Sequence, residues 1–331
     1  HVSQVFDAIG TQNDVEIVGF AEPNKEFAMR LLKEHGLPAS LWFPTLEALV
    51  EETNPEAVCA FNSIFKHLEV VKICAPKGIH VMVEKPLAVN TDHLAQMLSL
   101  VKKYNIQLLT NFETTWYPSN AKVWQMLKED KVLGDIRKVV IMDGHRGPIE
   151  IGCGPEFTDW LTDPVQNGGG ALIDFGCYGA DIMTWLMDGQ KPISVTAITQ
   201  QLKPEIYPEV DDEATIILTY PTCQAIIQAS WNWPFDRKDT EIYGTKGIVV
   251  ANKDMKMKYV SGERFGKESW LDLTPLPYDR SNVFPYLAAV VRGEIDPGND
   301  LSSLATNTVV VEILSAASES ARTGRTIFLE Q

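Results

Sequence analysis

Residues 81–86 read Val-Met-Val-Glu-Lys-Pro, and the rest of the chain is organised around this stretch. An apolar β-type run ends abruptly in Glu84, Lys85 and Pro86, and a helix pattern follows at residues 92–104. In a parallel α/β sheet, ligands bind outside the carboxyl ends of the strands. A charged pair at such an end faces a crevice, although these three residues alone fit a surface turn equally well.

The first part of the chain, up to Phe112, alternates helix and strand patterns. Strands are predicted at residues 15–20, 57–61, 79–83 and 106–111, and helices at 1–10, 26–34, 46–51, 68–74 and 92–104. Such alternation predicts βαβ units and a parallel sheet covered on both faces. It indicates a nucleotide-binding type of architecture without showing a nucleotide.

The pattern changes after Phe112. Strands are predicted at residues 136–142, 195–200, 214–220, 224–231, 240–243 and 248–251, with helices at 120–127, 171–187 and 303–321. Hairpin-like turns at Tyr220-Pro221 and at residues 244–247 predict a mostly antiparallel sheet that is open on one face. At 331 residues the chain exceeds what one hydrophobic core usually supports, so two domains are expected.

Composition excludes several classes of protein. The net charge of −15 argues against nucleic acid or an anionic membrane as a partner, because neutralising phosphates requires Lys and Arg. No apolar run approaches the length of a membrane-spanning helix. The five cysteines are scattered and lack CxxC spacing, so they predict reduced thiols, with neither a disulfide framework nor a metal site.

Residues 171–187 predict a helix that is apolar nearly all round and therefore buried. It nevertheless carries Asp174, Tyr178 and Asp181, whose i,i+4 and i,i+3 spacing places all three on one face. A carboxylate left unpaired in a core costs several kcal/mol, so this face must meet a cation or a wet cleft. The alternative is a structural network in which Asp174 pairs with a cation and Tyr178 is a satisfied core residue.

Other candidates carry weaker signals. Gly168-Gly169-Gly170 could cradle a phosphate at a helix N-terminus, but a hinge or close backbone packing is favoured. Glu22 closes a predicted strand, where a dinucleotide-binding fold places an acid for the adenosine ribose. His67 suits a helix cap or a surface position better than a catalytic one. Side chains that could line a substrate cleft are Trp116, Tyr117, Arg146, Trp160, Asp181, Trp231 and Arg237.

Glu84-Lys85-Pro86 and the run from Gly168 to Asp181 together resemble the Gfo/Idh/MocA oxidoreductases. The resemblance extends to Glu22-Pro23-Asn24, to Asn62-Ser63, to the turn at residues 133–136 and to residues 241–247. It implies a Rossmann-type NAD(P)-binding domain at residues 1–115. It also implies a substrate-binding and oligomerisation domain with a large open antiparallel sheet at residues 116–331. The first strand and GxGxxG loop of that family are expected just before His1.

The resemblance implies hydride transfer between nicotinamide and a hydroxyl-bearing carbon of a sugar, sugar derivative or cyclitol. Candidate cofactor contacts are Glu22, Asn62, Ser63, His67, Glu84, Lys85 and Asn111. NAD is expected rather than NADP, because the Glu22 carboxylate repels a 2′-phosphate. A homodimer or homotetramer that forms through the C-terminal sheet is also implied.

The catalytic hypothesis gives Tyr178 the role of acid/base, Lys85 that of the cation on the substrate oxygen, and Asp174 that of orienter. Many members of the family carry His at the position of Tyr178, so Lys85 as the proton carrier remains open. A tyrosine acting near neutral pH requires roughly 3–4 kcal/mol of phenolate stabilisation, which Lys85 is expected to supply.

Two other functions remain open on the same fold: a glycosidase that uses NAD for transient oxidation, and a ligand-sensing protein without catalysis. The joint presence of Lys85, Asp174 and Tyr178 favours an enzyme. A cytoplasmic location is expected, with a periplasmic or secreted one left open by the apparently incomplete N-terminus.

Overall fold

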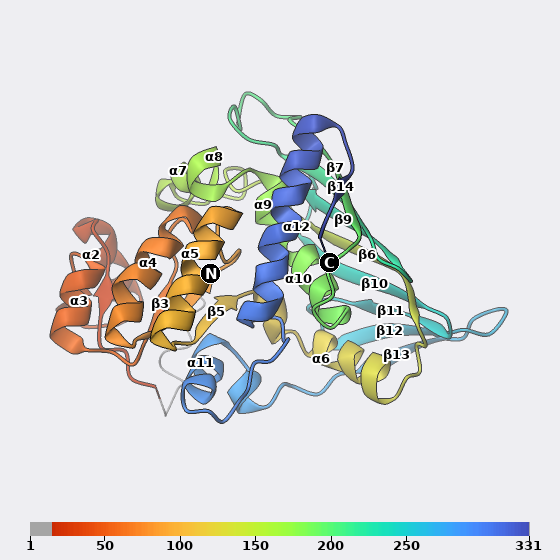
Figure 1. The fold of residues 1–331 in the computed structure, drawn as a ribbon, viewed down its shortest axis with the longest axis horizontal. Coiled ribbons are helices and arrows are strands. Elements are labelled where there is room, and N and C mark those ends of the chain that lie inside the picture. The colour runs from red at the N-terminus through yellow and green to blue at the C-terminus, as the bar shows by residue number, and fades with distance from the viewer. Residues whose placement is uncertain (1–14, 331) are drawn as a thin grey trace.

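The N-terminal half is a layered α/β structure in the computed structural model, which describes residues 15–330 (Figure 1). Strands β3 (Ala57–Ala60), β4 (His80–Glu84) and β5 (Leu108–Asn111) pair in parallel, with β4 in the centre. Helices connect them in the predicted alternation: α2 (Lys25–Glu34), α3 (Leu46–Thr53), α4 (His67–Cys74) and α5 (Thr91–Tyr104). The predicted parallel α/β class is confirmed.

The first predicted strand is shorter than expected. Among the described residues, β1 covers only Phe20–Ala21 and pairs in parallel with β2 (Trp42–Phe43), in a sheet separate from β3–β5. Val15 and Ile17 pack instead as partly buried side chains against the cluster around Met82 and Leu109. The helix predicted at residues 1–10 lies outside the described residues.

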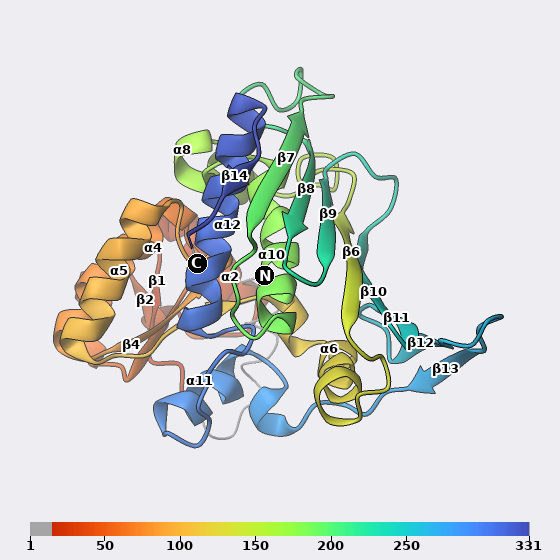
Figure 2. The ribbon, with the colours of Figure 1, turned by 45° about the vertical axis from the view of Figure 1, so that its right-hand side comes forward.

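The second half is built on a large open sheet, as predicted. Within the described chain it has nine strands in the order β13-β12-β11-β10-β6-β9-β8-β7-β14, and all its neighbours are antiparallel except β6 and β9 (Figure 2). The strands are β6 (Ile136–Gly144), β7 (Ser194–Gln200), β8 (Glu213–Thr219), β9 (Gln224–Ser230), β10 (Arg237–Gly244), β11 (Gly247–Ala251), β12 (Lys256–Ser261), β13 (Glu268–Asp272) and β14 (Ile327–Phe328). Strands β12, β13 and β14 were not predicted from the sequence.

Helices cover one face of this sheet. They are α6 (Pro118–Trp124), α9 (Ala171–Asp174), α10 (Gly176–Leu186) and α12 (Leu304–Thr323), and α10 packs on β6 and β9 while α12 packs on β7. The short helices α7 (Pro155–Leu161) and α8 (Pro164–Asn167) precede α9 and were not predicted.

The single helix predicted at residues 171–187 is in fact two helices. The chain breaks at Phe175, which ends α9 and begins α10. Gly170 enters α9 by close backbone packing, since a Cβ at this position would lie 1.8 Å from the carbonyl oxygen of Asp211. The Asp211 carboxylate accepts hydrogen bonds from the amides of Gly170 and Leu172 at 2.9 and 2.7 Å. Close packing, the favoured interpretation of the glycine run, is therefore what these contacts support.

The chain returns to the N-terminal sheet near its end. Helix α11 (Val283–Val291) packs against Met82 and Leu109, and Val311 of α12 joins the core of the N-terminal layers. The domain boundary placed at residues 115–116 falls at the end of the short helix η4 (Glu113–Trp116) and stays a prediction.

Candidate active site

The opening Glu-Lys-Pro stretch lies at the carboxyl end of the central strand β4. The peptide bond between Lys85 and Pro86 is cis. Glu84 is held from two sides: its Oε1 accepts from Asn111 Nδ2 at 2.8 Å, and its Oε2 accepts from the Lys85 amide at 3.1 Å. The strand end is therefore a fixed platform and not a loose surface turn.

The ammonium of Lys85 contacts Asp174. Lys85 Nζ lies 2.5 Å from Asp174 Oδ1 and donates to the Asp174 carbonyl oxygen at 2.8 Å, while Trp231 Nε1 donates to Asp174 Oδ2 at 2.9 Å. Burial works to lower the pKa of Lys85, but the Asp174 carboxylate outweighs it and holds that pKa above its usual value. Burial would raise the pKa of Asp174, but Lys85 keeps it below the usual range. The pair is therefore ionised.

Tyr178 lies beside this pair, on the first turn of α10. Lys85 Nζ is 5.0 Å from the centroid of its ring, and Phe112 packs edge-on against it at 5.5 Å. Tyr178 is 1% exposed, and burial followed by the nearby Glu84 raises its pKa well above 10. The expected depression of this pKa by Lys85 is thus wrong for the protein without bound molecules, because desolvation of the phenolate outweighs the nearby cation.

These groups open into a cleft of about 610 Å³. Six residues that the sequence singled out for the site line it: Glu84, Lys85, Tyr117, Trp160, Asp174 and Tyr178. Arg237 also lines the cleft and forms an ion pair with Asp239. The strand end and the downstream helix, which are the two halves of the predicted site, therefore line one cavity.

Four predicted substrate contacts lie elsewhere. Asp181 lies on α10 and is completely buried, and neither of its carboxylate oxygens has a hydrogen-bond partner within the described chain. Arg146 is exposed, and its carbonyl accepts from Lys203. Trp231 is buried behind Asp174, and Trp116 donates to Asn111 Oδ1.

The predicted cofactor contacts gather at the ends of β3, β4 and β5, with Glu22 at the end of β1. Asn62 Oδ1 is buried without a partner, and Ser63 Oγ donates to Gln166 at 2.8 Å. Glu22 Oε1 accepts from the Asn24 amide at 2.7 Å. His67 is neither a cap nor a surface residue: it is fully buried, Nδ1 lies 3.1 Å from the Leu87 carbonyl, and burial lowers its pKa to about 4.

Sequence reasoning missed three charged residues of the site. Lys238 lies opposite Asp143 on the inner face of the sheet, and Glu113 forms an ion pair with Lys238. A signal was present, because Asp143 has the same strand phase as the buried Val139 and Ile141, and Lys238 the same phase as Thr240 and Ile242. Charged residues in an inward phase indicate a polar site within a core.

Comparison with known proteins fits this geometry. Residues 4–112 match the oxidoreductase family with an NAD-binding Rossmann fold, and residues 121–250 match the Gfo/Idh/MocA C-terminal domain. The chain belongs to the Gfo/Idh/MocA family of oxidoreductases. Its cofactor is accordingly NAD. The residues at the strand ends fit this cofactor, since the unpartnered Asn62 Oδ1 lies where such a fold holds a dinucleotide.

Curated relatives of this Gfo/Idh/MocA chain are dehydrogenases. It is 27% identical over 313 residues to the trans-1,2-dihydrobenzene-1,2-diol dehydrogenase of Xenopus laevis, covering 92% of this chain and 90% of the relative. Two solved structures share its fold. One is levoglucosan dehydrogenase with NADH and levoglucosan, with a TM-score of 0.82, 19% identity and coverage of 99% of this chain and 95% of the other. The other is the aldose–aldose oxidoreductase of Caulobacter crescentus, with a TM-score of 0.82, 20% identity and coverage of 98% and 95%.

Two absences hold for residues 15–330. No group of three or more His, Cys, Asp or Glu side chains is arranged to hold a metal ion. No described helix is long and apolar enough to cross a membrane.

Proposed function

We propose that this oxidoreductase transfers a hydride between NAD and a hydroxyl-bearing carbon of a ring compound with several hydroxyl groups: a sugar, a sugar derivative or a cyclitol. The observation that carries the proposal is the Lys85–Asp174 contact of 2.5 Å beside the Tyr178 ring, at the mouth of β4 and inside the 610 Å³ cleft. Relatives that act on a diol and on an anhydrosugar add support from their names.

Asn62, Glu84 and Asn111 would hold the cofactor at the strand ends, with Glu22 near the adenosine ribose. Bound NAD supplies or accepts the hydride. The side chains in the cleft handle the oxygen and its proton. The Lys85 ammonium would donate to the substrate oxygen, and Asp174, fixed by Trp231, would keep Lys85 aimed at it.

The protonation states favour proton donation. Tyr178 carries its proton at neutral pH, and so does Lys85, since both pKa values are raised. In carbonyl reduction, the Tyr178 O–H gives its proton to the oxygen as the hydride reaches carbon. In alcohol oxidation, Tyr178 must first lose its proton to solvent and then takes the one from the substrate hydroxyl. Lys85 as the proton carrier is the alternative assignment.

Turnover of a panel of sugars, sugar acids, cyclitols and cyclic diols with NAD and NADP, followed by NADH absorbance, tests the proposal. Net NADH formation or consumption on one of these classes is expected. Lys85→Met should lower kcat by about 10³-fold, and Tyr178→Phe by about 10²-fold or more. Normal turnover in Tyr178→Phe together with none in Lys85→Met would transfer the proton role to Lys85.

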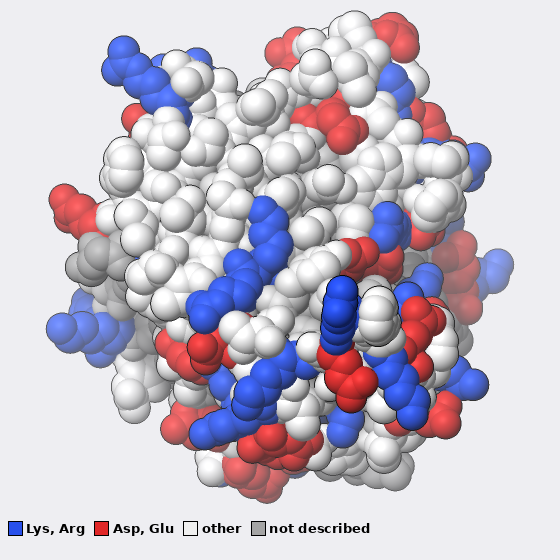
Figure 3. Space-filling view, turned by 90° about the vertical axis from the view of Figure 1, so that its right-hand side faces the viewer, with Lys and Arg blue, Asp and Glu red and all other residues white. Residues whose placement is uncertain are grey.

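The alternatives give different results in the same assay. A glycosidase with transient oxidation would cleave a glycosidic bond and show no net NADH. A sensor would bind a ligand and turn over none of the panel. We also propose a homodimer or homotetramer through the open face of the sheet, which Figure 3 shows as a broad area of uncharged side chains crossed by a diagonal row of Lys and Arg.

A further inference from the structure

The hydroxyl of Tyr178 contacts a second lysine. Lys238 Nζ donates to Tyr178 Oη at 3.3 Å and lies 4.3 Å from the ring centroid, closer than the 5.0 Å of Lys85. Lys85 is directed at Asp174, whereas Lys238 reaches the phenol from β10 on the opposite side of the cleft. The two lysines therefore have different roles: Lys85 faces the proposed position of the substrate oxygen, and Lys238 faces the hydroxyl of Tyr178.

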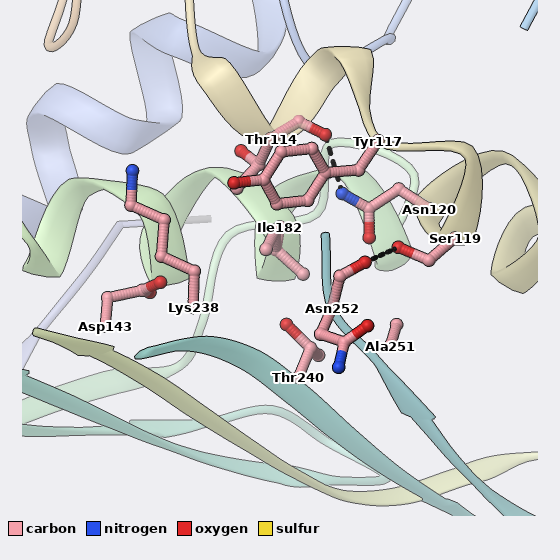
Figure 4. A pocket seen from close by; sticks show the side chains of 10 residues that line it. All are labelled: Thr114, Tyr117, Ser119, Asn120, Asp143, Ile182, Lys238, Thr240, Ala251 and Asn252. Atoms are coloured by element: carbon pink, nitrogen blue, oxygen red, sulfur yellow. Dashed lines mark hydrogen bonds between the residues drawn. The ribbon is translucent and has the colours of Figure 1, made fainter. Parts of the chain in front are cut away.

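Lys238 is itself held in place. Its ammonium forms an ion pair with Glu113, and the Lys238 side chain is 18% exposed. The other oxygen of Glu113 accepts from Tyr117 Oη at 2.6 Å. Figure 4 shows Lys238, Asp143, Thr114 and Tyr117 around one small cavity. Glu113, itself held by Tyr117, fixes the Lys238 ammonium and lowers the entropic cost of keeping it beside the phenol.

Asp143 lies behind Lys238 in the same register of β6 and β10. It is 1% exposed, Asp143 Oδ2 has no partner, and neither has Thr114 Oγ1, which lines the same cavity. The cavity measures about 10 Å³, room for about one water molecule. Burial raises the pKa of Asp143 to about 8 against the opposing effect of Lys238. Asp143 is therefore mostly neutral at pH 7 and leaves the charge of Lys238 uncompensated from this side.

We propose that Lys238 is the positioning residue of Tyr178, orienting its hydroxyl and stabilising its phenolate, with Glu113 and Asp143 fixing the place and the field of the Lys238 ammonium. This inference rests on the proposed function, in which Tyr178 exchanges a proton with the substrate oxygen. In the reductive direction Tyr178 loses its O–H proton to that oxygen. The phenolate then keeps the hydrogen bond from Lys238 until water returns a proton.

A hydrogen bond distinguishes Lys238 from Lys85. Burial and nearby acids oppose the phenolate. Each lysine is paired with a carboxylate, but Lys85 donates to Asp174, whereas Lys238 also donates to the phenol oxygen. The titratable groups that face Tyr178 come from every element packed against it: Glu84 and Lys85 after β4, Glu113 in η4, Asp174 in α9, Cys177 in α10, and Lys238 in β10 with Asp143 behind it. Among these described groups, Lys238 is the cation that donates to the phenol oxygen.

The first test is kinetic. In Lys238→Met, carbonyl reduction should show kcat lowered by about 10- to 100-fold, with KM changed less than about threefold. The alkaline limb of the kcat profile should move to higher pH by about one unit, because a phenol without its cation is a weaker acid. Lys238→Arg should restore most of kcat and the limb. The control is Lys256→Met, which removes the same charge from an exposed position on β12.

The second test does not need turnover. Tyrosines are replaced by fluorotyrosine, and the fluorine resonance of Tyr178 is identified by its loss in Tyr178→Phe. Lys238→Met should shift this resonance and raise its titration midpoint, whereas Lys256→Met should leave both unchanged. If Lys238→Met does not fold, Lys238→Gln carries the same comparison, since it removes the charge and keeps much of the length.

The outcomes separate the two proposals. An unchanged resonance and an unchanged pH limb in Lys238→Met or Lys238→Gln would overturn the role of Lys238. Full turnover in Tyr178→Phe would overturn the acid/base role of Tyr178, while the resonance would still decide whether Lys238 acts on the phenol.

Discussion

Lys85 and Asp174 show what a single buried ion pair contributes. Their side chains are 11% and 8% exposed, and Trp231 satisfies the second carboxylate oxygen. Removing one partner of such a pair leaves a buried charge and costs about 3–5 kcal/mol, whereas removing both costs much less. The pair therefore contributes little net stability, and its arrangement is better explained by a site that must present an ammonium.

A double-mutant cycle checks this at the residue scale. Lys85→Met and Asp174→Asn should each lower the free energy of unfolding by about 3 kcal/mol or more, and the double variant should lose less than the sum. The pKa of Asp174 is depressed in the fold, so its contribution is present above the unfolded value of about 4 and is lost as pH falls through the folded value. Urea unfolding at neutral and acidic pH measures both effects, and additive losses would refute the coupling.

Asp143 should give the free energy of unfolding the opposite dependence on pH. Its folded pKa of about 8 lies above the unfolded value of about 4, so the fold prefers the protonated acid. Stability from this group is complete below about pH 4 and is lost as pH rises through about 8. Asp143→Asn should therefore gain on the wild type by on the order of 4 kcal/mol between about pH 5 and pH 8 in urea unfolding. Asp272→Asn, exposed on β13, is the control and should show no such trend.

Glu22 is expected to set the preference for NADH over NADPH. In the proposed cofactor position the Glu22 carboxylate lies near the ribose and repels a 2′-phosphate. The Asn24 amide fixes the orientation of that carboxylate. Glu22→Gln should therefore narrow the preference for NADH over NADPH by about tenfold, as fluorescence titration of both cofactors would show. Glu47→Gln, at the exposed start of α3, should leave the ratio unchanged. Equal affinities in the wild type would remove the basis of the prediction.

At the scale of elements, local signals were readable and non-local ones were not. The bounds predicted around residues 79–83 and 92–104 agree closely with β4 and α5, because an apolar run and an Asn90 cap are written in adjacent residues. The pairing of Lys238 with Asp143 depends on which strand lies next to β10, which no local pattern specifies. Asp174 and Tyr178 both line the cleft although the break at Phe175 lies between them, whereas Asp181, on the same helix as Tyr178, is completely buried.

Helix α10 is seated by one glycine. Gly179 directly follows Tyr178, and a Cβ at this position would lie 2.5 Å from Ile227 Cγ2 on β9. Gly179→Ala should therefore lower the free energy of unfolding by about 1–3 kcal/mol, and it should reduce kcat by moving Tyr178. Ile227→Ala, which removes the atoms that the added Cβ would meet, should cost about 2–5 kcal/mol alone, yet it should recover part of the loss when combined with Gly179→Ala. Losses that simply add would show that Ile227 is not the obstacle.

At the scale of the whole molecule, the sequence predicted two layered units but not how the chain ties them together. The C-terminal helices α11 and α12 return to pack on the N-terminal layers, through residues such as Val311. Their apolar patterns predict burial, but the surface that buries them lies some two hundred residues away in sequence. Helix α12 packs on α5 and β5 of the N-terminal layers and on α9 and α10, and this shared packing helps to fix Lys85 relative to Tyr178.

The open face of the large sheet gives the last prediction. Strand register places Ile217, Ile226 and Val140 in one row on the side opposite α10, and Val250 continues it beyond Glu241. These side chains are only partly buried, and Trp270 near the end of the row is 63% exposed. A stable interface buries about 800 Å² on each partner, which an open nine-stranded face can supply.

Light scattering after size exclusion should therefore find a dimer or tetramer at micromolar concentration. Ile226→Lys places an ammonium in the centre of the row, where pairing two copies would bury the charge twice, so the variant should elute as a monomer. Val165→Lys adds the same charge at an exposed apolar position on α8 and should keep the wild-type mass. A monomeric wild type, or an Ile226→Lys variant of unchanged mass, would exclude this face as the interface. Because Asp143 and Lys238 lie on the other face of the same strands, the Ile226→Lys monomer should retain the fluorine resonance of Tyr178.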